Sequence, residues 1–242
     1  MSSFVDVTRT NPLGDVNAAS DALLSGTMCS SVSELLATLT TKASTMSTFE
    51  HLFYIVFIGD SSVGKSLILR TLCPAIANGR GPLQPTIGVE FATRIVLNGL
   101  VKLLLWDCSG DDRFRSIANS YLRGAHSAFL VFDTTNRASF ERLASLWLPL
   151  VRDLASDDIV LTVVGTTRAG EERCVSASEA QEFAERSASV YVQIDPHSST
   201  DCEAMLLEPH TERVLATALA KQVQSATVQS QRQQRASACE LL

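Results

Sequence analysis

A pattern of eight residues limits what this chain can fold into more than any other feature of its sequence. Residues 59–66 read Gly-Asp-Ser-Ser-Val-Gly-Lys-Ser and fit the phosphate-loop pattern G-x-x-x-x-G-K-[ST]. The continuous apolar run at 52–58 predicts a buried strand, and residues 67–72 predict a helix that ends before Pro74. A strand, loop and helix in this order point backbone N–H groups at an anion. The pattern therefore predicts a phosphate-binding site on an α/β fold.

The residue types within this loop predict separate roles. Lys65 would reach the outer phosphates as a point charge, and the Ser66 hydroxyl would bind Mg²⁺. The residues expected to contact phosphate are Gly59, Ser61, Ser62, Val63, Gly64, Lys65, Ser66 and Leu67, together with Gly110 further along the chain.

Strands and helices are predicted to alternate from residue 51 onward. The expected strands are 52–58, 91–98, 100–107, 127–133, 159–165 and 189–194, and the expected helices are 67–72, 112–121, 138–154, 176–187 and 211–224. Asn98-Gly99 is a hairpin signal, so the second and third strands should be antiparallel neighbours. We predict a three-layer P-loop fold: a six-stranded, mostly parallel sheet with one antiparallel edge strand and about five helices.

The two ends of the chain differ in composition from its middle. Residues 1–50 are rich in Ser, Thr and Ala, so we expect disorder there, with a docking helix at Ser33–Thr41 as the alternative. A start at Met46 would make the first 45 residues an extension of the gene model. We therefore divide the chain into a low-complexity extension (1–50), a phosphate-loop domain (51–224) and a flexible tail (225–242).

Overall composition excludes several classes of protein. The formal net charge is −6 over 242 residues and the basic residues form no stripe, so we expect no nucleic-acid partner. None of the six cysteines has C-x-x-C spacing, which predicts free thiols in a reducing compartment and no zinc site. We expect neither a signal peptide nor a membrane-spanning segment.

Three residues downstream of the loop suggest a switch that senses a triphosphate. Thr86 lies in a Pro/Gly-rich connection, and Asp107 ends an apolar strand three residues before Gly110. Ser66, Thr86 and Asp107 would organise Mg²⁺ around a triphosphate, while the Gly110 N–H would bond the γ-phosphate. The segments that carry Thr86 and Gly110 would then become ordered when the triphosphate binds, and would relax after hydrolysis.

These motifs resemble those of the Ras superfamily of small GTPases, and most closely its Rab branch. The Rab-like stretches are 86–91, 102–107, 112–117, 121–125 and 130–133, and the resemblance spans about 52–222. It implies GTP/GDP switching with Mg²⁺, an exchange factor, and a role in vesicle traffic. It also implies effector binding through the mobile loops, for which the candidate residues are Ile87, Gly88, Phe91 and Trp106.

The guanine-binding motifs depart from the family pattern. Residues 166–169 read Thr-Thr-Arg-Ala where the family has Asn-Lys-x-Asp, and 195–197 read Asp-Pro-His where it has Ser-Ala-Lys. No aromatic residue lies between 58 and 90 to stack on the base. Each lost charge-assisted hydrogen bond costs about 1.5–3 kcal/mol, so base readout should be weak. The remaining candidates for base contact are Thr166, Thr167, Arg168, Pro196 and His197.

The catalytic position is altered as well. Asp111 follows Gly110 where the family has Gln, and a carboxylate can accept but not donate a hydrogen bond to the attacking water. With Lys65 and Asp111 as the candidate catalytic residues, we predict very slow hydrolysis, unless Asp111 is protonated or turned away. Three interpretations remain: a diverged Rab-like switch, a pseudo-GTPase interaction module with weak, unselective or no nucleotide binding, and a kinase-type phosphotransferase. The hairpin and the absence of an Arg-rich lid disfavour the third.

The C-terminal sequence Cys-Glu-Leu-Leu suggests a lipid anchor. Cys239 is fourth from the end and the last residue is Leu, which fits a geranylgeranylation box. A single prenyl chain with only Arg232 and Arg235 nearby predicts weak, reversible binding. We therefore expect a cytoplasmic protein that meets the prenylation machinery and associates reversibly with the cytosolic face of an intracellular membrane.

Overall fold

A computed structural model describes residues 49–77, 82, 84–167 and 170–239. Within this part of the chain, the sheet and the elements that pack on it belong to one compact unit that ends at Leu219, and a second unit begins at Ala220. The helix expected at Ser33–Thr41 and the alternative start at Met46 lie outside the described residues.

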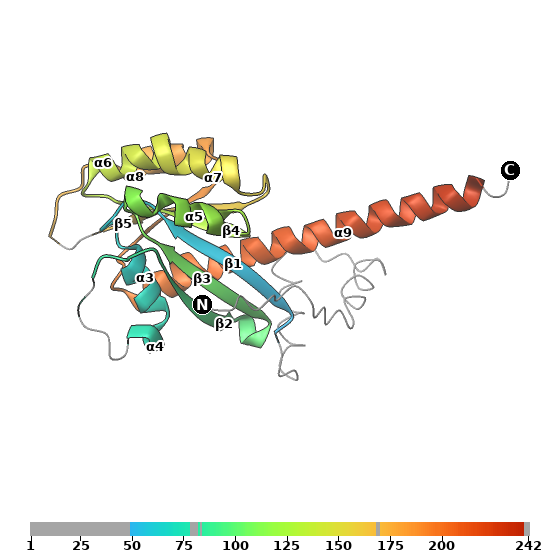
Figure 1. Cartoon of the computed structure of the whole chain (residues 1–242), viewed down its shortest axis with the longest axis horizontal. Coiled ribbons are helices and arrows are strands. Elements are labelled where there is room, and N and C mark those ends of the chain that lie inside the picture. The colour runs from blue at the N-terminus through green and yellow to red at the C-terminus, as the bar shows by residue number, and fades with distance from the viewer. Residues whose placement is uncertain (1–48, 78–81, 83, 168–169, 240–242) are drawn as a thin grey trace. The chain divides into compact units, whose positions relative to one another are not determined.

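A six-stranded sheet forms the centre of the first unit (Figure 1). Its strands are β1 (His51–Ile58), β2 (Val89–Val96), β3 (Val101–Cys108), β4 (Ser127–Asp133), β5 (Val160–Thr166) and β6 (Val190–Ile194). They lie in the order β2-β3-β1-β4-β5-β6, with β2 antiparallel to β3 and the other neighbours parallel. The predicted fold class, including the antiparallel strand at the edge, is confirmed.

The helices connect these strands and cover both faces of the sheet. They are α3 (Lys65–Leu72), α4 (Pro74–Ala77), α5 (Arg115–Leu122), α6 (Arg137–Arg142), α7 (Leu148–Leu154), α8 (Ala177–Arg186) and α9 (Glu208–Cys239). Helices α5 to α8 lie on one side of the sheet and α3 on the other (Figure 1). The predicted helix at 138–154 is interrupted by a π-helical turn, η4 (Leu143–Trp147), and a second π-helical segment, η5 (Asp201–Leu207), precedes α9.

Burial explains why the strands read as apolar runs. Every residue of β4 and β5 is buried, as expected for central parallel strands covered on both faces. Phe132 packs against Phe140 of α6 with ring centroids 4.9 Å apart, and Trp147 is fully buried on the same side. Because β1, β3, β4 and β5 run parallel, their carboxyl ends lie along one edge of the sheet, where open α/β sheets bind their ligands.

The C-terminal helix is longer than the sequence pattern suggested. A helix was expected at Thr211–Gln224 with a flexible tail from 225, but α9 runs from Glu208 to Cys239, so the expected end is wrong. Pro209 is the second residue of α9, which continues directly from the π-helical segment η5, and no Gly or Pro follows it in the helix. Ala, Gln and Arg favour helix even where no apolar stripe continues. Composition was therefore a poor guide to the backbone of this segment.

Candidate functional site

The loop at 59–66 joins β1 to α3 and depends on residues that tolerate a left-handed backbone. Gly59 has φ +143°, Ser62 +65° and Gly64 +98°. A Cβ atom at Gly59 would lie 2.1 Å from the Val131 carbonyl oxygen, so this turn can pass β4 only as glycine. The loop therefore curls tightly at the carboxyl edge of the sheet.

Lys65 is held inside this loop by the loop's own carbonyl groups. Its Nζ donates to Gly59 O at 2.8 Å and to Asp60 O at 2.6 Å, and only 5% of the residue is exposed. Burial lowers the pKa of Lys65, and the nearby Asp107 carboxylate opposes that change. Because an ammonium group has three N–H donors, a bound anion can accept the third.

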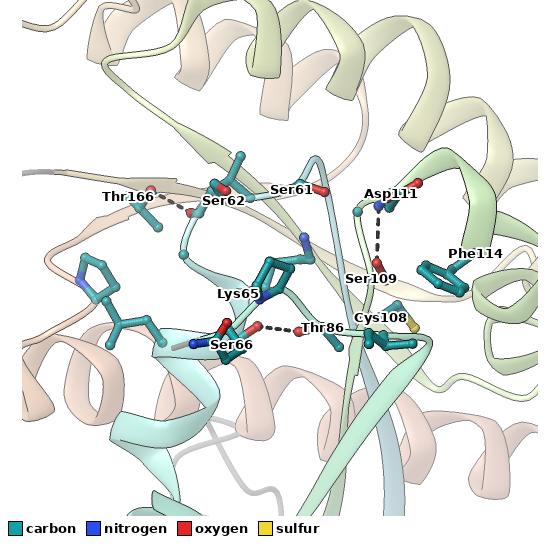
Figure 2. Close-up of a pocket in the computed structure, with 18 of the residues that line it drawn as sticks. Ser61, Ser62, Lys65, Ser66, Thr86, Cys108, Ser109, Asp111, Phe114 and Thr166 are labelled. Carbon is teal, nitrogen blue, oxygen red and sulfur yellow. Dashed lines mark hydrogen bonds between the residues drawn. The ribbon is translucent and has the colours of Figure 1, made fainter. Parts of the chain in front are cut away.

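Three oxygen atoms from separate segments converge beside Lys65. The Ser66 hydroxyl lies 2.9 Å from Thr86 Oγ1 (Figure 2). The Ser66 hydroxyl also donates to Asp107 Oδ2 at 2.5 Å, and Thr86 Oγ1 donates to the same Oδ2 at 3.2 Å. Asp107 is fully buried, which raises the pKa of its carboxyl group against the opposing effect of Lys65. Its other oxygen, Oδ1, has no hydrogen-bond partner among the residues that the structure describes.

This oxygen cluster fits Mg²⁺ bound together with phosphate. Hydroxyl and carboxylate oxygens are the ligands that Mg²⁺ prefers, and it is usually held by one or two carboxylates plus phosphate oxygens. Because Asp107 Oδ1 has no hydrogen-bond partner in the described part of the chain, this carboxylate can still accept a ligand. Within the described ranges, no group of three or more His, Cys, Asp or Glu side chains could hold a metal ion. Ser66, Thr86 and Asp107 are therefore the residues that would hold the ion.

Gly110 brings the segment after β3 into direct contact with the phosphate loop. A Cβ atom there would lie 2.2 Å from the Asp60 carbonyl carbon and 2.3 Å from the Ser61 nitrogen. The neighbouring Ser109 N–H donates to Gly88 O at 2.9 Å, which joins this segment to the connection that carries Thr86. The two segments expected to sense a γ-phosphate are thus hydrogen-bonded to each other.

Asp111 is paired with an arginine two residues away. Its carboxylate accepts from the Arg113 backbone N–H at 2.9 Å and from the side-chain Nε and Nη2 at 3.1 Å and 2.6 Å. These bonds lower the pKa of Asp111 to about 2. The carboxylate is therefore ionised near neutral pH, which argues against the alternative in which Asp111 is protonated.

A pocket of about 730 Å³ brings most of the predicted site residues together. Its lining includes the predicted residues Ser61, Ser62, Val63, Gly64, Lys65, Ser66, Leu67, Thr86, Ile87, Gly110, Asp111, Thr166, Thr167, Pro196 and His197. It also includes Gln84, Pro85, Cys108, Ser109, Arg113, Phe114 and Asp195, which were not predicted although each is close in sequence to a predicted residue. Arg168 lies outside the described residues. The volume is within the range of small-molecule sites.

Two threonines that line this pocket are already hydrogen-bonded to the protein. Thr166 Oγ1 donates to Val63 O at 2.9 Å and to Phe132 O at 3.1 Å, which ties β5 to the phosphate loop. Both the N–H and the hydroxyl of Thr167 donate to Ile194 O, at 3.0 Å and 3.2 Å. The Thr166 hydroxyl and the Thr167 N–H and hydroxyl, which were predicted to contact a base, therefore already donate to protein carbonyl groups.

The 195–197 turn beside them offers few donors of its own. The His197 N–H donates to Asp195 Oδ1 at 2.9 Å, and Pro196 has no N–H. The Pro196 carbonyl accepts from Thr71 Oγ1 at 2.8 Å, which holds the turn against α3. A base edge that needs backbone N–H donors would find none available in this turn.

The residues expected to form an effector face lie outside the pocket, apart from Ile87 at its rim. Ile87 is 81% exposed and Phe91 58% exposed. Phe91, Trp106 and Tyr121 form a continuous aromatic row, with successive ring centroids 5.0 Å and 4.6 Å apart. Gly88, with φ +77°, connects this row to Thr86. An apolar surface thus adjoins the segment that would respond to a nucleotide.

The fold and site together define the class of protein. A parallel sheet with a phosphate loop after its first strand, a buried lysine and a cluster of magnesium-type ligands is characteristic of P-loop nucleotide-binding proteins. Residues 54–213 match the model of the Ras family.

Curated relatives narrow this assignment. Ras-related protein Rab-2B of Dictyostelium discoideum is 39% identical over 69% of this chain and 82% of its own length. Ras-related protein Rab11B of Nicotiana tabacum is 36% identical over 68% and 76%, and Ras-related protein rab-11.1 of Caenorhabditis elegans is 38% identical over 68% and 78%. The chain belongs to the Ras family of small GTPases, in its Rab branch.

Proposed function

We propose that this protein is a nucleotide-dependent switch of intracellular vesicle or membrane traffic that binds GTP and GDP with Mg²⁺. The observation that carries the proposal is the convergence of Ser66, Thr86 and Asp107 beside Lys65, where one Asp107 oxygen has no partner among the described residues. Three segments of the chain meet there, and the Lys65 ammonium lies close enough to influence the Asp107 carboxylate. The Rab-named relatives support the cellular role.

The switch would work through two segments that respond together. Bound Mg²⁺ would supply positive charge to the phosphates and to Asp107. Thr86 and the Gly110 N–H would gain partners only when a triphosphate is present. Because Ser109 N–H donates to Gly88 O, ordering of one segment would order the other. The exposed face at Ile87 and Phe91 would then present a defined surface to an effector.

Hydrolysis by this site should be slow. Lys65 can stabilise charge on the phosphates, but Asp111 can only accept a hydrogen bond from a water molecule. The ionised carboxylate also places negative charge near the anionic γ-phosphate. Its pairing with Arg113 holds it in that ionised form.

Base recognition should be weak and poorly selective. The donors of Thr166 and Thr167 are committed to protein acceptors, and Pro196 has none. These same observations favour a second candidate function, a pseudo-GTPase interaction module that keeps the fold and binds nucleotide little or not at all. An exchange factor is an expected partner only under the first proposal.

Membrane association is proposed through prenylation of Cys239. This residue ends α9, the last described helix. In the described part of the chain, no helix is long and apolar enough to span a bilayer. Partitioning of the native protein into detergent should decrease in Cys239→Ser, and partitioning that is unchanged by this substitution would reject the anchor.

A nucleotide titration tests the proposal. The full chain is titrated with GTP, GDP and ATP, each with and without Mg²⁺, in the wild type and in Lys65→Ala. Lys102→Ala is the matched control, because Lys102 lies over the Phe49 ring at 5.1 Å and does not line the pocket. Magnesium-dependent GTP binding that is lost only in Lys65→Ala supports the switch, and no binding of any nucleotide supports the pseudo-GTPase.

A further inference from the structure

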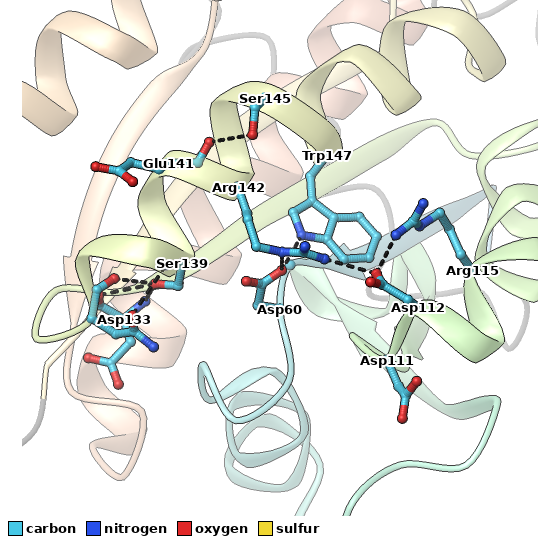
Figure 3. Close-up of polar contacts among 12 residues, drawn as sticks. Asp60, Asp111, Asp112, Arg115, Asp133, Ser139, Glu141, Arg142, Ser145 and Trp147 are labelled. Atoms are coloured by element: carbon cyan, nitrogen blue, oxygen red, sulfur yellow. Dashed lines mark hydrogen bonds and ion pairs between the residues drawn. The ribbon is translucent and has the colours of Figure 1, made fainter.

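One guanidinium group connects the phosphate loop to the segment that follows β3. Arg142, at the end of α6, donates from Nε to Asp60 Oδ1 at 2.9 Å and from Nη2 to Asp112 Oδ1 at 2.9 Å (Figure 3). Asp60 is the second residue of the phosphate loop, and Asp112 begins the short 3₁₀ turn η3 (Asp112–Phe114) directly after Asp111. The three residues come from elements that are far apart in the sequence.

The phosphate-loop end of this connection is anchored in the core. The fully buried Trp147 donates from Nε1 to the same Asp60 oxygen at 2.8 Å. Arg142 directly precedes the π-helical turn Leu143–Trp147 and Trp147 is its last residue, and both reach a single carboxylate. Such turns interrupt the regular helical spacing and occur often at functional sites. The Asp60 side chain is only 19% exposed, so this end of the connection is well shielded from water.

The other end restrains a short segment that lines the pocket. Asp112 accepts from Arg142 and also forms an ion pair with Arg115 of α5. Asp111 and Gly110 immediately precede it, and Gly110 already touches the phosphate-loop backbone. Movement of this segment away from the loop would therefore break the Arg142 contact to Asp112.

We propose that Arg142 is a positioning residue that holds the segment 109–114 against the phosphate loop whether or not a γ-phosphate is present. The inference rests on the proposed switch function and modifies it in one respect: of the two segments that would respond to a triphosphate, 109–114 would move less than the connection that carries Thr86. A segment that is held in both nucleotide states changes less on hydrolysis, since a ligand shifts an equilibrium only by its differential affinity for the two states. The structural difference between the active and inactive forms would accordingly be small in this segment.

Limited digestion with trypsin measures this restraint directly. Cleavage after Arg113, whose side chain is 80% exposed, is followed by mass spectrometry in protein loaded with GDP, loaded with GTPγS, or free of nucleotide. In the wild type we expect nearly equal rates with the two nucleotides. In Arg142→Ala we expect cleavage about fivefold faster with GDP, and a smaller increase with GTPγS. An increase of this size is expected because the substitution removes one partly exposed ion-pair network, which makes local opening of the segment easier.

Two further variants separate positioning from general destabilisation. Arg137→Ala is the matched control, because Arg137 lies in the same helix but pairs with Glu141 and Glu179 instead of the loops. Arg142→Lys keeps the charge without the two-armed geometry and should give an intermediate rate. Unchanged cleavage after Arg113 in Arg142→Ala, or an increase spread evenly over the chain, would overturn the inference.

The same experiment distinguishes failure of this inference from failure of the proposed function. If the wild type binds no nucleotide, the switch proposal fails, yet the nucleotide-free samples still report whether Arg142 restrains the segment. If nucleotide binds normally and the Arg142 variants digest like the wild type, only the restraint is rejected.

Discussion

Replacing Gly110 by alanine tests how closely the segment after β3 must approach the phosphate loop. The new Cβ would lie 2.2 Å from the Asp60 carbonyl carbon, 2.3 Å from the Ser61 nitrogen and 2.5 Å from the Gly59 oxygen. The first of these contacts is roughly 1 Å closer than the 3.4 Å at which ordinary contacts begin, and all three atoms belong to the backbone and cannot rotate away. One of the two segments must therefore shift.

The size of the effect follows from the cost of overpacking. Extra methyl groups forced into well-packed sites cost about 1–3 kcal/mol. If the segment moves to avoid that cost, its N–H leaves the position that faces a γ-phosphate, and Mg·GTPγS binding weakens by roughly 10- to 100-fold. Binding of Mg·GDP, which lacks that phosphate, should change much less.

Calorimetric titration of the wild type, Gly110→Ala and Gly124→Ala with both nucleotides provides the assay. Gly124→Ala is the matched control, since a Cβ atom there meets nothing within 4 Å. Thermal unfolding of each protein shows whether the cost appears as lost stability instead. The reasoning is refuted if Gly110→Ala matches the wild type in both nucleotide affinity and stability, or if Gly124→Ala shows the same loss.

Three other substitutions test separate parts of the account. Asp107→Asn should weaken Mg²⁺-dependent nucleotide binding by about tenfold while binding without Mg²⁺ changes little, because one charge-assisted ligand is lost; equal affinities with Mg²⁺ would contradict this role. Asp111→Gln should raise single-turnover GTP hydrolysis by at least about tenfold, because an amide can both donate and accept; a wild-type rate already typical of Rab proteins would defeat the prediction. The buried His210 has its pKa lowered to about 3 by desolvation, against 6.5 when exposed. The unfolded chain therefore binds a proton between these pH values that the native state does not, and chemical denaturation should show stability falling by about 1.4 kcal/mol per pH unit on acidification, relative to His210→Asn. Parallel pH profiles for the two proteins would exclude a neutral buried histidine.

The sequence predicted those parts of the fold and site whose signals are local. The strands β4 and β5 read directly as apolar runs because both of their faces are buried. The phosphate loop could be recognised because its conformation requires glycine at fixed spacing, as Gly59 and Gly64 show. Thr86 and Asp107 do meet Ser66, and Gly110 does approach the phosphate loop, but their roles toward a metal-bound triphosphate stay predictions.

Features that depend on packing between distant segments could not be predicted. Arg142 and Asp60 are 82 positions apart, and nothing local marks the two as partners. The π-helical turn at Leu143–Trp147 does not disturb the helical hydrophobic pattern enough to be seen in the sequence. Thr166 was a candidate for contact with a base, but its hydroxyl donates to Val63 O of the phosphate loop. Such commitments of hydrogen-bonding groups become visible only once the chain is folded.

Native mass spectrometry of the folded 242-residue chain shows directly whether the loop at 59–66 holds a nucleotide. At saturating GDP or GTPγS with Mg²⁺, we expect a mass increase of one nucleotide together with one magnesium ion, and loss of both in Lys65→Ala. Folded protein that stays at its unliganded mass with every nucleoside di- and triphosphate would contradict the claim that the loop at 59–66 encloses a magnesium-bound nucleotide.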